Sequence, residues 1–306
     1  MVQPIVFLPN RRCRNLVAGL AGIVLSLMPA AAQRGGSGFA AAPPPANPTF
    51  KFMGPATGNR ISAATGIPGD PTTYYVGAAS GGVWKSTNSA QSFVPVFDSQ
   101  AVQAIGALAV SRSNHDIVWA GTGEAWAIRD SDMMGDGVYK STDAGATWTN
   151  MGLRETGRIG RIIVNPVNPD IVFVCAAGRL TGPQQERGVF RTEDGGKTWD
   201  RSLFVDADTG CSGLSMDASD SKTLVAGAWR VVMHPYAMFS GLPESEFTAH
   251  GPGSGVYITH DGGTTWKRIE GHGMPKPPVG KVDVAIAPSN PKRIYALIQT
   301  ADQGSI

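Results

Sequence analysis

The sequence predicts an all-β protein, a β-propeller built from four-stranded repeats. Three observations lead to this prediction: a turn motif that returns at intervals of tens of residues, a repeated order of short apolar segments around it, and a composition rich in turn-forming residues. Of the 306 residues, 39 are Gly and 22 are Pro, and only 16% are charged. Such a composition suits many short strands joined by turns. Self-similarity at this period is typical of propellers and solenoids.

The turn motif has three clear copies and one degenerate copy. The clear copies occupy residues 141–148, 192–199 and 259–266, and each has Asp in third place and Trp in last place. The degenerate copy, residues 86–93, has Asn for Asp and Phe for Trp. The carboxylate or amide caps backbone N–H groups of a tight turn, the next residues supply its positive φ, and the aromatic ring anchors the hairpin to its neighbour. This is the Asp-box, and it assigns structural roles to Asp143, Trp148, Asp194, Trp199, Asp261 and Trp266.

Four repeats align on these turns, and a fifth begins before the sequence stops. The first covers residues 61–97, and the next four start near residues 105, 159, 212 and 282. Each full repeat contains an apolar first strand, an aromatic-rich second, a Gly-Val-aromatic third and a fourth that starts at the Asp-box aromatic residue. Four-stranded repeats of this length are propeller blades. Because a propeller closes its ring to remove exposed edges, four and a half blades indicate a fragment or the start of a longer product.

The N-terminal region precedes the repeats and has a different composition. Residues 1–32 combine three arginines, an apolar run and a final Ala-Ala-Ala, which together predict an export signal cleaved after Ala32. The apolar run is too short to favour a membrane anchor, so we expect no membrane span after cleavage. Residues 33–48 are rich in Gly and Pro and predict a linker, and residues 49–306 form the propeller. The mature protein is therefore expected in the periplasm or outside the cell.

Charge and cysteine content narrow the possible partners. Cleavage removes three arginines and no acidic residue, so the formal net charge falls from +2 to −1. No Lys- or Arg-rich run remains, which argues against nucleic acid as a partner. Two of the three cysteines survive cleavage, Cys175 and Cys211. Each lies in an apolar, strand-like context, and we expect buried free thiols rather than a disulfide.

The repeats and two further patterns carry a resemblance to a known family. Residues 77–85, Gly-Ala-Ala-Ser-Gly-Gly-Val-Trp-Lys, and the Asn168-Pro169-Asp170 turn resemble secreted bacterial proteins of the sortilin-like, Asp-box (BNR repeat) family. The likeness extends from about Phe50 to the end, and members are often labelled glycosyl hydrolase or xyloglucanase-like. Sialidases, xyloglucanases, sortilin-type receptors and a photosystem assembly factor share such blades. The resemblance therefore implies the fold and leaves several activities open.

Blade topology predicts where chemistry could occur. Hairpins between the first and second and between the third and fourth strands lie on one face, so the Asp-boxes mark that face. The long insertions, residues 121–136, 176–187 and 229–254, fall on the opposite face with the blade-to-blade segments. They bring carboxylates, arginines and aromatic rings around the channel mouth, a mixture that carbohydrate sites need. We take as catalytic candidates Glu124, Asp130, Asp132 and Glu186, and as substrate-binding candidates Trp126, Arg158, Arg187, Trp229 and Arg230.

Glu124 is the most specific of these candidates. It follows a buried strand directly and is bracketed by small residues, which would place its carboxylate at the channel mouth. Arg230 occupies the comparable place in the fourth repeat. An ion pair between Glu124 and an arginine of another blade explains the pattern equally well. Long surface loops are also polar without any function.

Two enzyme families can be compared with the sequence directly. Sialidase-like enzymes clamp a substrate carboxylate with three arginines, but the arginine-Ile-Pro signature is missing, and Arg158 and Arg161 come from one blade; we reject this class. Xyloglucanases carry a catalytic Asp in an early blade that reads Asp-Val-Gly-Gly-aromatic. The matching segment here has Ala79 in place of that Asp. This departure argues against xyloglucan hydrolysis by the usual carboxylate pair.

The sequence leaves two classes of function. The five histidines show no metal-ligand spacing, so we expect no metal site and no cofactor. One class is a glycosyl hydrolase-like, xyloglucanase-like protein that acts on or binds polysaccharide at the insertion loops. The other is a non-catalytic, sortilin-like scaffold that binds peptide or protein partners there.

Overall fold

The computed structural model describes residues 54–55, 60–124, 133–233, 247–248, 250–271 and 273–300. The chain divides into two units, Met1–Phe50 and Lys51–Ile306. The signal and linker expected at residues 1–48 lie outside the described residues, all of which belong to the second unit. Within the described parts of the chain, no helix is both long and apolar enough to span a membrane.

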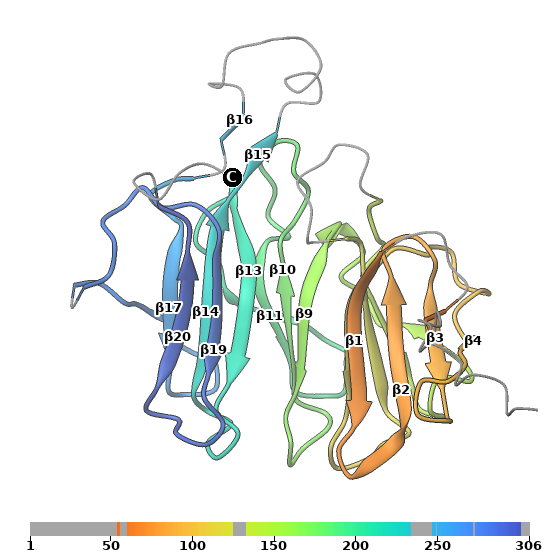
Figure 1. Ribbon diagram of the computed structural model, residues 1–306. Helices are drawn as coiled ribbons and strands as arrows, with labels where there is room; N and C mark the ends of the chain where they lie inside the picture. The colour runs from red at the N-terminus through yellow and green to blue at the C-terminus, as the bar shows by residue number, and fades with distance from the viewer. Residues whose placement is uncertain are drawn as a thin grey trace, which may run out of the picture. The chain divides into compact units, whose positions relative to one another are not determined.

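Four four-stranded antiparallel sheets and the beginning of a fifth make up this unit, as the repeats predict (Figure 1). Blade 1 consists of β1 (Ile61–Ile67), β2 (Asp70–Ala78), β3 (Val83–Ser86) and β4 (Val94–Pro95). Blade 2 consists of β5 (Ile105–Val110), β6 (Val118–Thr122), β7 (Val138–Ser141) and β8 (Thr149–Asn150). Blade 3 consists of β9 (Ile159–Val164), β10 (Val172–Ala176), β11 (Gly188–Thr192) and β12 (Asp200–Leu203).

The last two sheets differ in completeness. Blade 4 consists of β13 (Thr209–Met216), β14 (Leu224–Arg230), β17 (Gly255–Thr259) and β18 (Lys267–Arg268). A two-stranded ribbon, β15 (Val232–Met233) and β16 (Phe247–Thr248), is inserted between β14 and β17. The described part of blade 5 has β19 (Val282–Ile286) and β20 (Ile294–Ile298). A short 3₁₀ helix, η1 (Arg154–Thr156), connects blades 2 and 3.

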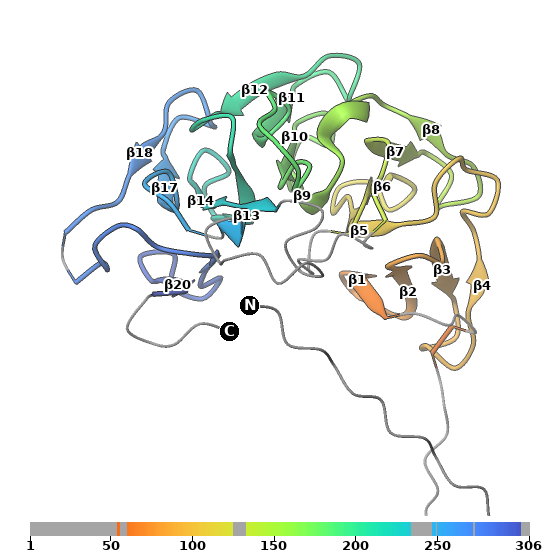
Figure 2. The same cartoon turned by 90° about the horizontal axis from the view of Figure 1, so that it is seen from above.

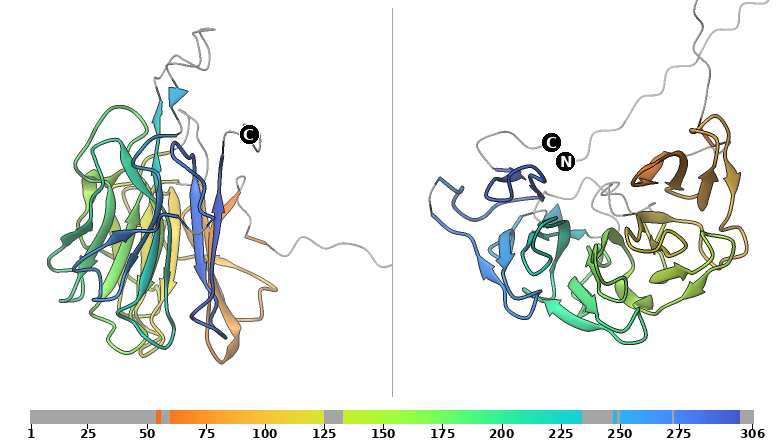
Figure 3. Two further views of the ribbon diagram at one scale, coloured as in Figure 1. Left: turned by 90° about the vertical axis from the view of Figure 1, so that its left-hand side faces the viewer. Right: turned by 90° about the horizontal axis from the view of Figure 1, so that it is seen from below.

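Successive sheets lie side by side, with the first strand of each blade on the inside. Seen from above and from below, β1, β5, β9 and β13 follow one another on the inner side, and β4, β8, β12 and β18 lie outside (Figures 2 and 3). The second strands of blades 2 and 3 lie between neighbouring sheets, and all five residues of both β6 and β10 are buried, whereas β2 and β20 contain exposed residues. Burial of both faces explains why the sequences of β6 and β10 are continuous apolar runs rather than alternating apolar and polar residues.

A repeated close contact joins neighbouring blades at the inner strands. A Cβ atom added to Gly77 would lie 2.4 Å from Ile105 Cγ2, and one added to Gly121 would lie 2.4 Å from Ile159 Cγ2. A glycine in the second strand thus makes room for a β-branched side chain from the next blade. Since interiors are packed without spare volume, a larger residue at either glycine would push the blades apart.

The contact between blades 3 and 4 is made in a different way. The positions equivalent to Gly121 and Ile159 are Cys175 and Cys211, and the two cysteines form a disulfide with an S–S distance of 2.07 Å. The expectation of free thiols is therefore wrong. Both residues do lie in buried, apolar strands, but they lie on adjacent blades and face each other, with a Cα–Cα distance of 5.1 Å.

Candidate functional site

The two faces of the propeller carry different kinds of connection. On one face, which we call the Asp-box face, the third and fourth strands of blades 1 to 4 are joined by the Asp-box turns. On the other, the insertion face, lie the connections between second and third strands and the segments between blades. The strands therefore place the Asp-boxes and the long insertions on opposite faces, as the topology predicts.

Each Asp-box aspartate is used within its own turn. Asp143 Oδ1 accepts a hydrogen bond from the backbone N–H of Thr147 at 2.8 Å, and Oδ2 accepts one from the Thr147 hydroxyl at 2.6 Å. The Ser141 hydroxyl donates to Asp143 Oδ1 at 2.7 Å and accepts from the Gly145 N–H at 2.8 Å. These hydrogen bonds, the Thr147 hydroxyl first, lower the pKa of Asp143 to about 2. The equivalent hydrogen bonds in blades 3 and 4 lower the pKa values of Asp194 and Asp261.

The degenerate Asp-box of blade 1 keeps this geometry with different residues. Asn88 Oδ1 accepts from the Ser92 N–H at 3.0 Å, and Ser86 Oγ accepts from the Ala90 N–H at 3.0 Å. Ser89 and Ala90 adopt the positive φ values, 59° and 62°, that a pair of glycines adopts in blade 3. The turn therefore tolerates the loss of both glycines, at the cost of a backbone conformation that side chains disfavour.

The Asp-box tryptophans reach back to the preceding blade. Trp148 Nε1 donates to the Val96 carbonyl at 2.8 Å, and its ring meets Phe97 edge-on at a centroid distance of 5.2 Å. Trp199 Nε1 donates to the Met151 carbonyl at 2.8 Å, and Trp266 Nε1 contacts Ser202 Oγ at 3.0 Å. Each tryptophan thus joins two sheets through its ring and its N–H group.

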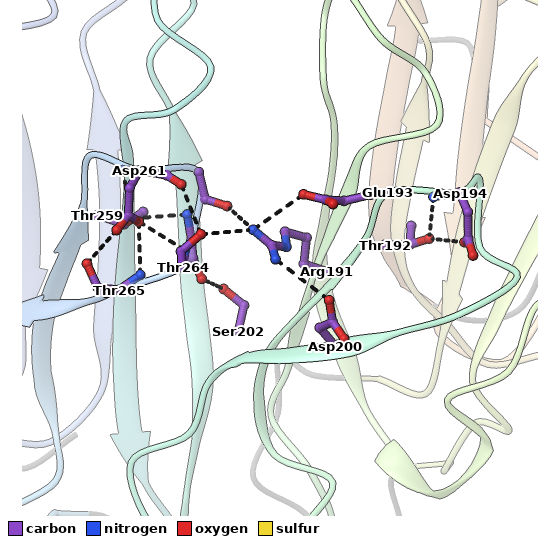
Figure 4. Close-up of polar contacts among 12 residues, drawn as sticks. Arg191, Thr192, Glu193, Asp194, Asp200, Ser202, Thr259, Asp261, Thr264 and Thr265 are labelled. Carbon is purple, nitrogen blue, oxygen red and sulfur yellow. Dashed lines mark hydrogen bonds and ion pairs between the residues drawn. The ribbon is translucent and has the colours of Figure 1, made fainter.

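A cation in the third strand of each of blades 1 to 3 binds the next Asp-box. Lys85 Nζ donates to the Ala144 carbonyl at 2.8 Å, Lys140 Nζ to the Gly195 carbonyl at 3.1 Å, and an Arg191 N–H to the Gly262 carbonyl at 2.9 Å. Figure 4 shows Arg191 lying between the Asp-box turns of blades 3 and 4. The sequence analysis did not identify these residues. Their constant place directly before the first Ser or Thr of the motif is the signal that could have found them.

On the insertion face, Glu124 lies at the junction of blades 1 and 2. It follows β6 directly, is only 2% exposed, and its carboxylate forms an ion pair with the guanidinium of Arg60. Arg60 directly precedes β1, and its side chain is 42% exposed, whereas that of Glu124 is 3% exposed. The structure thus contains the interblade ion pair that the sequence offered as one explanation of Glu124.

Three other candidates gather around the junction of blades 3 and 4. Arg187, directly before β11, is completely buried, and Trp229 in β14 is 3% exposed. Arg230, the last residue of β14, pairs with the Asp208 carboxylate at 3.2 Å. Arg187 also contacts Asp208, through the backbone carbonyl at 2.5 Å, so these residues form one cluster.

Arg158 and Glu186 are the remaining described candidates, and three further candidates lie outside the described ranges. Arg158 directly precedes β9 and is 4% exposed. Glu186 is half-buried, and its backbone carbonyl accepts from Gln184 Nε2 at 3.3 Å. Trp126, Asp130 and Asp132 fall within residues 125–132, which are not among the described residues.

The partners in three ion pairs on this face were not predicted by the sequence analysis. Arg60 pairs with Glu124, Arg179 pairs with Glu155, and Asp208 pairs with Arg230. Each pair joins residues from different blades or from a blade and a connecting segment, so spacing along the sequence does not reveal it. No group of three or more His, Cys, Asp or Glu suited to a metal ion occurs among the residues described.

Comparison with known proteins identifies the fold. The model of the family described as Sortilin, neurotensin receptor 3 matches residues 136–272. An ancestral GH74 enzyme is 18% identical with a TM-score of 0.55, over 82% of this chain and 30% of that one. The GH74 enzyme of Niastella koreensis is 19% identical with a TM-score of 0.53, over 81% of this chain and 37% of that one.

The similarity to these proteins covers only part of their length and concerns the fold alone. The chain spans about a third of the length of the two GH74 enzymes, and at such identity the similarity concerns the fold. No match was found among curated proteins. The Asp-box turns, the four-stranded sheets and the matching family segment together show that the chain is an Asp-box β-propeller.

Proposed function

We propose that this exported propeller is a glycosyl hydrolase-like, xyloglucanase-like protein that binds polysaccharide at its insertion face. The observation that carries the proposal is the contrast between the two faces. On the Asp-box face the three aspartates are engaged within their turns. On the insertion face, Arg179 with Glu155 and Arg230 with Asp208 form ion pairs whose side chains remain 26% to 65% exposed. Exposed arginines and carboxylates can exchange hydrogen bonds with sugar hydroxyls.

Binding is favoured over hydrolysis by two details of the same face. Ala79 is 1% exposed and stands where xyloglucanases, which the sequence resembles, carry a catalytic Asp. Glu124 is 2% exposed, and its carboxylate is paired with Arg60. Because hydrolysis of a glycosidic bond requires two carboxyl groups beside the scissile bond, this arrangement supports recognition without cleavage by Glu124. The fold likeness to GH74 enzymes supports a glycan as the ligand.

A polysaccharide panel that includes xyloglucan tests this proposal on the mature natural protein. Pull-down binding and released reducing ends are measured together, for the wild type and for Glu124→Gln and Arg230→Gln. We expect binding without sugar release, and weaker binding for Arg230→Gln only. Sugar release that disappears in Glu124→Gln would instead make the protein a hydrolase with Glu124 in the chemistry. Absence of any binding in the panel would reject the proposal.

A second candidate is a non-catalytic scaffold for peptide or protein partners. The match of residues 136–272 to the sortilin family favours it, since this segment contains the cluster of Arg187, Asp208 and Arg230. The two proposed functions use the same insertion face but differ in the ligand that binds there. Retention of peptides, but of no polysaccharide, with the same loss in Arg230→Gln would support the scaffold.

We also propose that the protein is exported, because its N-terminal segment combines basic residues with an apolar run. The disulfide between Cys175 and Cys211 supports it, because such bonds persist mainly in oxidising compartments.

A further inference from the structure

Arg187 is a fully buried arginine held by backbone carbonyls on the insertion face. Its guanidinium donates to the carbonyls of Asp208 at 2.5 Å, Val231 at 3.1 Å and Gly182 at 3.2 Å, and also to that of Arg179. These oxygens belong to three segments: the blade 3 insertion, the connection between blades 3 and 4, and the residue that directly follows β14. One side chain therefore ties two neighbouring blades together at this face.

The planar fork of the guanidinium is what makes this arrangement possible. Arginine offers five N–H donors in fixed directions, whereas lysine offers three from a single nitrogen. Burial lowers the pKa of Arg187 to about 10, against the opposing charges of Asp208 and Asp206, so the group stays protonated at neutral pH. The chain also leaves space for it: a Cβ atom on Gly178 would lie 2.4 Å from Arg187 Cγ and 2.7 Å from its Nε.

Further hydrogen bonds link the same segments around the guanidinium. The Gln184 N–H donates to the Ala207 carbonyl at 2.9 Å, and the Val231 N–H donates to the Asp208 carbonyl at 3.3 Å. Leu180, Trp229 and Val231 pack as a small apolar cluster beside them. Arg187 is therefore the charged centre of an ordered loop assembly.

We propose that Arg187 is a positioning residue of the insertion face, which holds the backbone that presents Arg179 and Arg230 without itself touching a ligand. It binds the Arg179 carbonyl directly, and it fixes the backbone of Asp208, whose carboxylate pairs with Arg230. The ligand-binding part of this inference rests on the proposed function, and the holding of the segments does not. Arg187 thereby has a role different from the direct substrate contact expected from the sequence.

Arg191 in β11, the strand that directly follows Arg187, provides a matched control. It too donates to a backbone carbonyl of blade 4, that of Gly262, but on the Asp-box face. Blades 1 and 2 use Lys85 and Lys140 at this position, so Arg191→Lys replaces one working residue by another. Arg187→Lys makes the same chemical change at the carbonyl cluster, where a single ammonium group cannot reach oxygens in several directions.

The experiment measures amide hydrogen exchange and xyloglucan affinity in the mature wild type, Arg187→Lys and Arg191→Lys. For Arg187→Lys we expect exchange in segments 178–186 and 206–209 to be at least about tenfold faster, because a charge-assisted hydrogen bond is lost, with segment 259–265 unchanged. Xyloglucan affinity should fall by about tenfold. Arg191→Lys should leave both segments and the affinity as in the wild type. Gly178→Ala, which displaces Arg187 from the other side, should reproduce the Arg187→Lys result.

Each other result has a defined meaning. Wild-type exchange and affinity in Arg187→Lys would overturn the inference. Faster exchange spread evenly over all blades, with unchanged affinity, would also overturn it, because Arg187 would then be only a stabilising residue. If the wild type does not retain xyloglucan, the proposed ligand is wrong, and local exchange alone decides whether Arg187 holds the two segments.

Discussion

Asp143 binds its own turn with both carboxylate oxygens, and this fixes how its stability contribution depends on pH. Hydrogen bonds from Thr147 and Ser141 lower the pKa of the folded state to about 2, below the ordinary value of 3.8. A lowered folded-state pKa means that the contribution is fully present above the unfolded-state pKa. It is then lost as the pH falls through about 2.

The Asp143→Asn variant tests in which direction the stability contribution of Asp143 changes with pH. The variant keeps an acceptor oxygen but has no charge, and Asn88 shows that the turn accepts an amide. We expect the free energy of unfolding of Asp143→Asn to be lower than that of the wild type at pH 7. The difference should shrink between about pH 4 and pH 2. Urea unfolding at several pH values measures it, and a difference that does not change with pH would contradict the assignment.

The ion pair of Arg60 and Glu124 gives a second prediction at the residue scale. Arg60→Ala leaves a buried carboxylate without its partner and should lower the free energy of unfolding by about 2 kcal/mol. Adding Glu124→Gln removes the buried charge, so the double variant should recover part of this loss. Chemical denaturation of the two single variants and the double variant completes the cycle. Strict additivity would show that the two residues are not coupled.

At the scale of the element, the junction between blades 3 and 4 differs from its neighbours by a covalent bond. Cys175→Ser with Cys211→Ser should lower the free energy of unfolding under oxidising conditions by about 3 kcal/mol, since the bond closes a loop of 36 residues. Cys175→Gly with Cys211→Ile installs the side chains that the junction of blades 2 and 3 uses. We expect this variant to be more stable than the Ser variant and insensitive to reductant.

Thermal unfolding with and without reductant compares the wild type and both double variants. If the variant with Cys175→Gly and Cys211→Ile is no more stable than the variant with two serines, the surrounding strands do not accept the glycine–isoleucine contact of blades 2 and 3.

The repeated elements were predictable because the side chains that make them act locally. The Asp-box needs its capping Asp, its positive-φ residues and its aromatic anchor within eight positions, so the motif can be read directly from the sequence. The disulfide was not predictable in this way. Cys175 and Cys211 replace a glycine and an isoleucine in buried strands, and only the alignment of blades on each other shows that they face one another.

At the scale of the whole molecule, the sequence predicts which loops share a face, because strand order alone decides it. It does not predict which side chains meet there. Arg60 reaches Glu124 from 64 residues away, and Arg187 reaches Val231 from 44 residues away. The sequence singled out Arg187 and Glu124 as polar residues beside buried strands. Their burial depends on how neighbouring blades pack, so a direct ligand contact could not be told from a structural one.

The cation that precedes the Asp-box in blades 1 to 3, and its absence in blade 4, distinguish the surfaces that the blades present to one another. Tyr75 and Lys85 of blade 1 both contact the Ala144 carbonyl of blade 2, and blade 3 offers Phe173 and Arg191 to blade 4 in the same places. Blade 4 has Val225 and Ile258 there, in an apolar cluster. A blade inserted between blades 4 and 5 would therefore need an apolar surface where blades 2 to 4 present the carbonyl of an Asp-box turn.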